Sequence, residues 1–422
     1  MVSNNGAIAR MAAIVVAVII VIVAVVAGYF VAASLTGVAN TTSSNSNTIN
    51  TPGSNATSVT LGFAGTADVT DLPALVLWQI YGPEVGLNIH VVYLGTDASI
   101  PEGIVSGAIE VGESGFAGVL QSTESAGNAS GSYPFVAFTS YEAINDFGIV
   151  VSNSIHSWSD LANQPIAVEA IGSDTDIFCH LTLTAHGIPK SQQNCLPTGD
   201  AGSRLDALLA GKVVGDWTEP YQMITAAQTG KFHILETIPH EIPGLIGSLL
   251  YTSRAYAAAH PDVITKMTEA MILAHRWAWN ETTWLQKEQI DFPGTNATLA
   301  ATSWKVWIAM GLWAPNGGFN SNEANFSETY YLQQQEINSF LPIKYWADFS
   351  YEQKALATIG NYSGPANGYV NPNIPTINAQ IPGEPSAILG GLGSSGALAV
   401  TSGGTMLATP INSVDFGRGR SS

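Results

Sequence analysis

Charged residues are scarce in this sequence, and positive charge is the scarcest. Charged residues make up 11% of the 422 residues, with 14 Lys and Arg against 32 Asp and Glu. No Lys or Arg occurs between Arg10 and Lys190. Because nucleic-acid binding depends on cations that neutralise phosphates, this composition argues against a nucleic-acid partner. Few charges of either sign fit a secreted protein that works at low external pH, whereas a halophilic protein would carry many more carboxylates.

Motifs for metal binding and for nucleophilic catalysis are also missing. The chain has no CxxC or HExxH motif, and His180 and His186 are not spaced as zinc ligands on one helical face. It lacks the GxSxG motif of a nucleophile elbow, and no histidine stands in an obvious position for a catalytic base. We therefore expect a protein that is not an enzyme and that holds neither a metal nor a cofactor.

Cysteine is nearly absent, since Cys179 and Cys195 are the only two. In a protein outside the cell, the natural interpretation of such a pair is a disulfide. It would join a predicted helix to the strand that follows, and it would contribute about 3 kcal/mol by the loop-entropy model. A metal pair is the less favoured alternative.

A long apolar run stands near the N-terminus. Met11–Ala33 is almost unbroken by polar residues and is preceded by Arg10. Its length suits a membrane-spanning helix and exceeds the usual core of a signal peptide. Arg10 favours an N-terminus on the inside. We expect residues 1–36 to be an anchor with the rest of the chain outside; the alternative is a signal sequence, cut near Ala33 or processed before the apolar run.

Polar and small residues flank the central part of the chain. Residues 37–58 are a Ser/Thr/Asn-rich linker, and residues 366–422 are a Pro/Gly/Ser-rich flexible tail or cell-wall contact. Glycosylation sequons, which suit an exterior protein, occur at Asn40, Asn55, Asn128, Asn280, Asn296, Asn325 and Asn361.

The stretch LDALLAGKVVGDWTEPY, residues 205–221, predicts a helix followed by a strand. Leu205, Leu208 and Leu209 share one helical face, and Gly211 stands where a left-handed C-cap is expected. A strand is expected to begin at Val213 and to run toward Trp217 and Glu219. Ligands of open α/β sheets bind at such strand ends.

A similar pattern occurs earlier, in IPEGIVSGAIEVGESGFAG, residues 100–118. Ile104 and Val105 supply apolar contacts to a helix that ends at Gly107, and a strand follows over 109–111. Residues 112–115 then predict a turn into a new helix. Two units with the same order of features suggest two similar lobes with a cleft between them.

Five segments, in this order, resemble the solute-binding proteins of ABC importers that handle sulfonates, taurine, nitrate and thiamine-precursor pyrimidines. The resemblance covers roughly residues 59–360. The segments are VTLGFAGTADVTDLPALVLWQIYGPEVGLNIHVVYLG, IVSGAIEVGESGFAG, FGIVVSNSIHSWSDLANQPIAVEAIGSDTD, LDALLAGKVVGDWTEPY and AYAAAHPDVITKMTEAMILAHRW.

The resemblance implies an α/β fold of the periplasmic-binding-protein type II-like class. Two lobes, each with a central β-sheet flanked by helices, would enclose a ligand cleft. Lobe I would comprise residues 59–145 and 246–365, and lobe II residues 146–245. The implied partners are a small-molecule solute and an ABC permease in the membrane, and we expect a monomer.

The pattern of apolar residues predicts the elements within these lobes. Strands are expected at 59–63, 88–94, 135–139, 147–151, 166–169 and 248–252. Helices are expected at 177–186, 255–284 with an interruption at His260-Pro261, 330–340 and 351–359. The tryptophans at 277–313 are expected to be packing residues.

The expected ligand site combines strand ends and helix N-termini, whose free N–H groups carry partial positive charge. Thr70 or Asp71, by contrast, is expected to cap a helix. The residues expected to bind the ligand are Gly65, Thr66, Asp68, Glu113, Ser114, Thr139, Ser140, Ser173, Asp174, Thr175, Trp217 and Glu219.

Carboxylates in this set bear on the charge of the ligand. Glu113 in one lobe and Asp174 and Asp176 in the other would oppose an anion, because like charges in a cleft cost energy. They would favour a cation or a hydrogen-bond donor such as an amine or aminopyrimidine. The alternative is that both aspartates only cap a helix. Trp217 would either stack on a planar or cationic group or belong to the core.

We therefore expect an extracellular substrate-binding protein, tethered at the cell surface, that closes two lobes on a small organic solute. Sulfonate, taurine, nitrate-like anion and pyrimidine or amine all remain open as the solute. One alternative is a cell-surface structural or adhesive protein on the same fold. Another, an enzyme of the related pyrimidine-synthesising branch, lacks supporting motifs.

Overall fold

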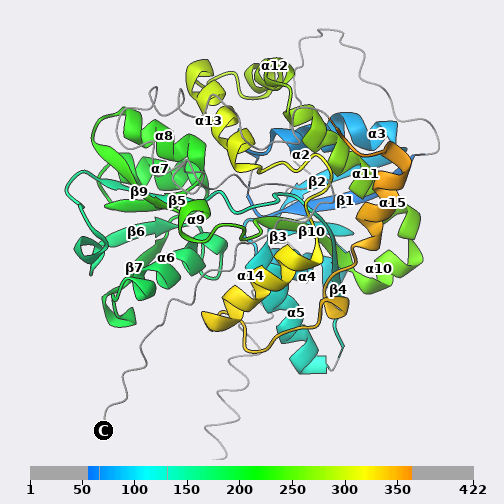
Figure 1. Ribbon diagram of the computed structural model, residues 1–422, viewed down its shortest axis with the longest axis horizontal. Helices are drawn as coiled ribbons and strands as arrows, with labels where there is room; N and C mark the ends of the chain where they lie inside the picture. Colours follow the sequence, from blue (N-terminus) through cyan, green and yellow to red (C-terminus); the bar gives the residue numbers. More distant parts are fainter. Residues whose placement is uncertain (1–55, 66, 131, 364–422) are drawn as a thin grey trace, which may run out of the picture. The chain divides into compact units, whose positions relative to one another are not determined.

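A computed structural model of the chain describes residues 56–363 except 66 and 131 (Figure 1). The predicted anchor, nearly all of the predicted linker and the predicted tail lie outside these residues. Within the described ranges, no helix is both long enough and apolar enough to cross a membrane. The described chain is built on two five-stranded sheets, with helices packed on each.

The first sheet has the strand order β2-β1-β3-β10-β4. Strands β1 (Thr57–Phe63), β2 (Leu87–Tyr93) and β3 (Val111–Gly115) run parallel, while β10 (Ser248–Ser253) lies antiparallel between β3 and β4 (Phe135–Ser140). Alternating apolar residues explain the pairing, since Val59, Leu61 and Phe63 of β1 are all buried.

The second sheet has the order β7-β6-β8-β5-β9. Strands β6 (Pro165–Val168), β7 (Asn194–Pro197) and β8 (Gly215–Thr218) run parallel, while β5 (Gly148–Ser152) lies antiparallel between β8 and β9 (Phe232–Thr237). Each sheet therefore consists of a parallel trio with the earliest strand in its middle, followed by an antiparallel strand and an edge strand. The prediction of two similar lobes is confirmed.

Helices cover both sheets, and we call each sheet with the helices packed on it a lobe. The first lobe carries α2 (Leu72–Val76), a π-helical turn (Leu77–Tyr81), α3 (Gly82–Glu84), α4 (Ser99–Ser106), α5 (Phe116–Ser130), α10 (Arg254–Ala259), α11 (Pro261–Ala278) and α15 (Ser350–Ile359). The second carries α6 (Asp174–Ala185), α7 (Ala201–Leu209), α8 (Pro220–Gln228) and α9 (Ile238–Glu241). Short 3-10 turns span Trp158–Leu161, Lys190–Gln192 and Ile343–Tyr345.

Three further helices connect the lobes: α12 (Glu281–Asp291), α13 (Ala297–Met310) and α14 (Ser321–Gln333). Helix α13 packs on α8 of the second lobe, whereas α12, which precedes it, contacts α11 and α2 of the first (Figure 1). Between them lies a tryptophan cluster in which Trp307 contacts both Trp284 and Trp313. The tryptophan-rich stretch is therefore core, as predicted.

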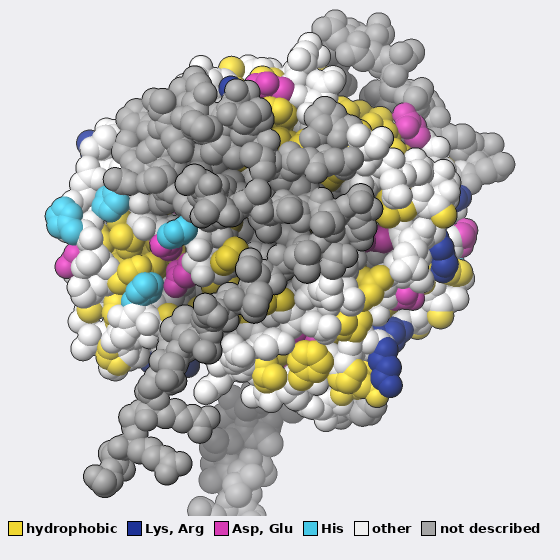
Figure 2. Space-filling view, in the orientation of Figure 1, with side chains coloured by type: hydrophobic (Ala, Val, Ile, Leu, Met, Phe, Trp, Pro, Cys, Tyr) yellow, Lys and Arg dark blue, Asp and Glu magenta, His cyan; other side chains and the backbone are white. Residues whose placement is uncertain are grey.

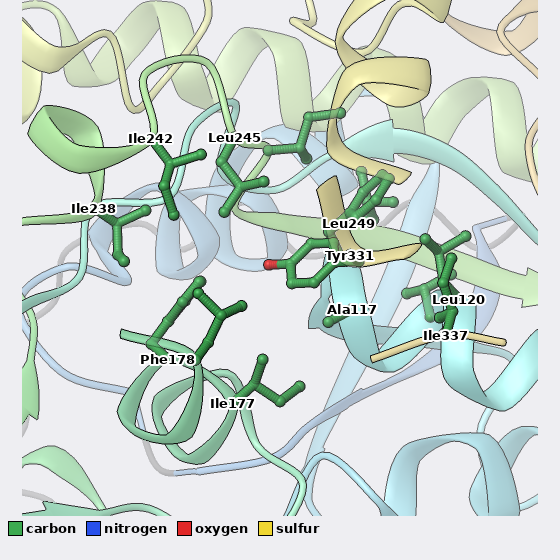
Figure 3. Packing of buried hydrophobic residues seen from close by; sticks show 14 of the residues in the cluster. Ala117, Leu120, Ile177, Phe178, Ile238, Ile242, Leu245, Leu249, Tyr331 and Ile337 are labelled. Carbon is green, nitrogen blue, oxygen red and sulfur yellow. The ribbon is translucent and has the colours of Figure 1, made fainter. Parts of the chain in front are cut away.

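The largest hydrophobic core includes residues of both lobes. Figure 3 shows Ile177 and Phe178 of α6 on one side of this core, with Tyr331 of α14 and Leu120 of α5 on the other. Because α14 contributes Tyr331, the C-terminal part of the chain helps to hold the second lobe against the first.

The two cysteines form the predicted disulfide. Cys179 in α6 bonds to Cys195 in β7, with their Cα atoms 6.3 Å apart. The bond thus ties α6 to the edge strand beside it.

Several local predictions were wrong. Residues 112–115 lie in β3 rather than in a turn, because they pair with β10. Glycine at 112 leaves room for the Ile100 side chain. Val105 is 71% exposed, since it lies on the outer face of α4. The last strand of the second trio begins at Gly215 rather than Val213. The helix predicted at 330–340 ends instead at Gln333.

Uncharged side chains dominate the described part of the surface in Figure 2, where Lys and Arg occur at only a few places near the margin of the view. This distribution agrees with the low charge of the sequence. The sequon asparagines within the described ranges are all exposed: Asn128, Asn280, Asn296, Asn325 and Asn361. Asn40 and Asn55 lie outside those ranges.

Candidate functional site

A cavity of about 150 Å³ is lined by side chains from both lobes. The first lobe contributes residues that follow β1 and β2, together with the end of β3 and the start of β10. The second contributes residues that follow β6 and β8, together with the start of α7. Because ligands of open α/β sheets bind beyond the carboxyl ends of parallel strands, this is the position expected for a ligand.

Carboxyl groups dominate the cavity wall. The acidic residues that line it are Asp68, Asp71, Asp97, Glu113, Glu142, Glu169, Asp174, Asp200 and Glu219. Of the described residues that line the cavity, Arg204 is the only Lys or Arg. The cavity is therefore far richer in potential negative charge than in positive charge.

Arg204 is already paired within the wall. Its side chain is 2% exposed, with Nε 3.3 Å from Asp216 and Nη2 3.4 Å from Glu219. Its Nη1 donates to the carbonyl of Gly199 at 2.9 Å. The guanidinium therefore stabilises the packing of α7 against β8 and leaves little charge for an anion in the cavity.

At one end of the cavity, the acidic side chains have hydrogen-bond donors. Asp68 accepts from Gln222 Nε2 at 2.8 Å, and this bond crosses from α8 of the second lobe to the loop after β1. Asp71 accepts from the backbone N–H of Asp68 at 2.9 Å and from the hydroxyl of Tyr141. Burial raises the pKa of Asp71 to about 7.

At the other end lie four carboxyl groups, Asp97, Glu113, Glu169 and Asp174, which we call the acidic quartet. The Ser114 hydroxyl donates to Asp97 at 3.2 Å. No side-chain hydrogen bond or ion pair reaches Glu169 or Asp174 from the described residues. Asp174 is nevertheless only 7% exposed. The quartet is thus the part of the wall with the fewest internal partners.

The lobes touch at the quartet. A Cβ at Gly115, the last residue of β3, would overlap the carboxyl group of Asp174 at the start of α6. Glycine is therefore the residue that lets the end of β3 approach α6 so closely. The contact places Asp174 between the two sheets.

Burial favours the protonated forms of these four groups, and repulsion from Asp97 adds to this for Glu113, Glu169 and Asp174. Burial raises the pKa of Asp97 to about 6 and that of Glu169 to about 8. The pKa values of Glu113 and Asp174 lie well above the ordinary range because both groups are buried and because each faces Asp97. A positive charge placed among them would favour their ionised forms instead.

The structure places several of the predicted ligand residues at the cavity wall: Gly65, Asp68, Glu113, Asp174 and Glu219. Ser114, Ser173 and Thr175 lie directly behind the wall. Ser114 holds Asp97, Ser173 caps α6, and the hydroxyl of Thr175 accepts from the backbone N–H of Glu169 at 2.8 Å. Thr66 lies outside the described residues.

Other residues considered for the site do not line the cavity. Trp217 is buried in the core against Phe178, with ring centroids 6.0 Å apart, because alternate residues of β8 face opposite sides of the sheet. Thr139 and Ser140 do not line the cavity; they donate to Glu352 at 2.9 Å and to the carbonyl of Gly317 at 2.6 Å. Asp176 caps the turn before α6, where it accepts from the N–H of Gly172 at 2.9 Å.

Other residues of the wall were not predicted from the sequence. Asp97 follows β2, and Glu169 follows β6, so the strand-end signal was present for both. Asp71 was assigned to a helix cap, yet its side chain makes no capping bond to α2 and faces the cavity. Arg204 gave no signal, because its carboxylate partners come from a strand predicted to begin nine residues later.

No group of three or more His, Cys, Asp or Glu within the described ranges has a geometry that could hold a metal ion. The crowded carboxyl groups of the cavity wall thus do not form an evident metal centre.

The fold is similar to that of several solved structures. A protein from Bordetella bronchiseptica RB50 has a TM-score of 0.62 at 18% identity, covering 73% of this chain and 99% of its own. The periplasmic nitrate-binding protein NrtA from Synechocystis PCC 6803 has a TM-score of 0.59 at 10% identity, covering 72% and 89%. The alkanesulfonate-binding protein SsuA from Xanthomonas axonopodis pv. citri, bound to MOPS, has a TM-score of 0.53 at 14% identity, covering 70% and 100%.

These likenesses show that the chain has the periplasmic-binding-protein fold, as the sequence resemblance implied. By sequence, no protein-family model and no curated protein matches the chain. Two of these neighbours are named as nitrate- and alkanesulfonate-binding proteins, and those ligands are anions. The acidic wall of the present cavity differs from what an anion would require.

Proposed function

We propose that this protein is the solute-binding component of an ABC importer, which captures a small organic solute in the cavity and delivers it to a membrane permease. The cavity carries this proposal, because residues of both lobes line it and a solute there would contact both at once. A solute that binds both lobes favours the arrangement in which they are closed. The function is binding without a chemical step.

Contacts across the cavity support lobe closure as the mechanism. The hydrogen bond between Gln222 and Asp68 joins the lobes at one end, and the approach of Asp174 to Gly115 joins them at the other. We assign residues 59–145 and 246–365 to lobe I and 146–245 to lobe II, with the chain crossing between the sheets before β5 and before β10. These crossings would act as the hinge.

The wall narrows the choice of solute. The cavity volume of about 150 Å³ is below the roughly 300–1,000 Å³ of pockets for drug-sized ligands, so the solute is small. Sulfonate and nitrate-like anions would meet carboxyl groups, and the one guanidinium of the wall is already paired. Of the solute classes considered, an amine or an aminopyrimidine fits best.

The cellular setting forms part of the same proposal. The apolar run Met11–Ala33 would tether a monomer to the membrane with its binding domain outside the cell. The exposure of Asn128, Asn280, Asn296, Asn325 and Asn361 supports glycosylation at the cell surface.

A thermal-shift screen of the full chain tests the proposal, with sulfonates, taurine, nitrate, amines and pyrimidines as the panel. A solute at one hundred times its dissociation constant should stabilise the protein by about 2.7 kcal/mol. Asp174→Asn should weaken that response, whereas Asp206→Asn, on the exposed face of α7, should leave it unchanged. If no solute of any charge stabilises the protein, the importer proposal fails and the cell-surface structural alternative gains support.

A further inference from the structure

We infer that the solute is a small organic cation whose N–H groups are held by the acidic quartet, between two carboxyl groups from each lobe. This inference rests on the proposed function, because it uses the same cavity. It goes further by naming the charge of the solute and the part of the wall that binds it.

Asp174 is the observation that carries the inference. It lines the cavity and is 7% exposed, yet no hydrogen bond or ion pair reaches its carboxyl group from the described residues. A buried carboxyl group without a partner costs free energy. A donor in the cavity would supply the partner that the folded chain does not.

The other members of the quartet face the same space from both sides. Asp97 and Glu113 belong to the first lobe, and Glu169 lies directly after β6 of the second. Glu169, like Asp174, has no side-chain hydrogen bond within the described part of the chain. A solute with several N–H donors could therefore bond to both lobes at once.

Among the described residues of the wall, none neutralises the quartet. Arg204, the only Lys or Arg of the lining, is bound to Asp216, Glu219 and the carbonyl of Gly199. An anionic solute would disfavour ionisation of these carboxyl groups further, and a neutral one would not favour it. An ammonium or amidinium group would form charge-assisted hydrogen bonds, which are about twice as strong as neutral ones.

Binding of a cation would be coupled to loss of protons. The cation favours ionised carboxylates, so protons leave as it binds, and affinity should rise with pH. Affinity should rise with pH up to about pH 8 through Glu169, whose pKa is about 8, whereas the contribution of Asp97, with a pKa of about 6, ends near pH 6 because that group is already ionised above it. Other titratable or charged groups facing the quartet are Asp71, Tyr141, Glu142, Asp200, Arg204, Glu219, Tyr251 and Tyr331.

Isothermal titration of the full chain tests the inference, with ethylenediamine and guanidinium as cationic probes, ethanesulfonate as the anion and ethylene glycol as the neutral probe. Titrations in two buffers that differ in heat of ionisation count the protons released. We expect a cationic probe to bind with proton release, and its affinity to rise about tenfold per pH unit for each proton released.

Two variants locate the effect. Asp174→Asn and Glu169→Gln should each lower the affinity for the cationic probe at least tenfold and reduce proton release, whereas Asp206→Asn should change neither. Circular dichroism and the response of the fold to denaturant check that the variants are folded.

Binding of ethanesulfonate or ethylene glycol alone would overturn the cation inference while leaving the solute-binding function standing. Cation binding without proton release, or with full affinity in both quartet variants, would overturn the role of the quartet. If no probe binds and the thermal-shift panel is also negative, the proposed function itself falls.

Discussion

Both ends of the cavity are lined by carboxyl groups, but the ends differ in the hydrogen-bond donors that the protein supplies to these groups. At the end near Asp68 and Asp71, each carboxyl group receives internal donors, including the cross-lobe bond from Gln222. At the quartet end, Glu169 and Asp174 receive none from the described residues. A cluster of acidic side chains therefore indicates a ligand only where the protein itself supplies few hydrogen-bond donors to it. The carboxyl groups at the first end have partners within the fold, whereas Glu169 and Asp174 at the second end are the groups that we propose to bind a ligand.

The largest expected effect on stability comes from the buried ion pairs of Arg204 in the cavity wall. Arg204→Met removes the cation from two buried carboxyl groups, Asp216 and Glu219, and should lower the free energy of unfolding by about 3–5 kcal/mol. Denaturant unfolding at pH 7 measures the loss. Lys212→Met, at an exposed position nearby, should change stability little. Equal losses in the two variants would show that the buried ion pairs of Arg204 do not stabilise the folded protein.

A smaller effect is expected from the donor to Asp71. Tyr141→Phe keeps the ring but removes the hydroxyl that bonds to the carboxyl group, so stability should fall by about 1–3 kcal/mol. Thermal unfolding at pH 7 measures it. Tyr133→Phe is the matched control, because its hydroxyl has no hydrogen-bond partner in the described ranges and its loss should matter little. A neutral result for Tyr141→Phe would remove the distinction between the two ends.

The cross-lobe bond should have a modest effect on stability and a clearer one on closure. Gln222→Met removes the donor to Asp68 at similar side-chain volume and should cost about 1 kcal/mol. Energy transfer between dyes on the two lobes should show a larger mean separation without solute. If the separation is unchanged, the bond does not help to hold the lobes together.

The effect expected from the quartet is the smallest one at pH 4, and it grows as the pH rises. The pKa of Glu169 is raised to about 8 in the folded protein, so the folded state holds its proton longer than the unfolded chain does. This contribution is fully present below about pH 4.5 and is lost as pH rises through about 8. Glu169→Gln should therefore match the unmodified protein at pH 4 and become relatively more stable by pH 8. Denaturant unfolding across this range measures the divergence, and parallel pH profiles would contradict it.

Periodicity and end signals predicted much of the fold. Alternation in Val59, Leu61 and Phe63 located β1, and Gly107 and Gly211 both take the left-handed conformation expected at helix ends. The two-lobe organisation followed from the repeated order of features. Residues 112–115 were misread because glycine in a sequence does not distinguish a turn from a strand that packs closely under a neighbouring side chain.

The site was harder to predict, because its chemistry depends on contacts between distant segments. Strand ends located Glu113, Asp174 and Glu219. They did not show that Arg204 would be neutralised within the wall while Asp174 would not. The position of Trp217 could not be predicted for a simpler reason. In a strand as short as β8, with both faces buried, sequence alone does not show which face meets the cavity.

The position of β10 has a consequence for the order of folding during synthesis. This strand lies between β3 and β4, yet it begins at Ser248, whereas β4 ends at Ser140. Until the ribosome has made the whole second lobe, β3 and β4 remain edges with unpaired backbone groups, which are prone to association with other chains. At about 5–20 residues per second, this exposure lasts several seconds at least. The strands of the second lobe are contiguous in sequence, so that lobe can complete its sheet first. The first lobe is therefore the described part of the nascent chain that is most prone to association with other chains.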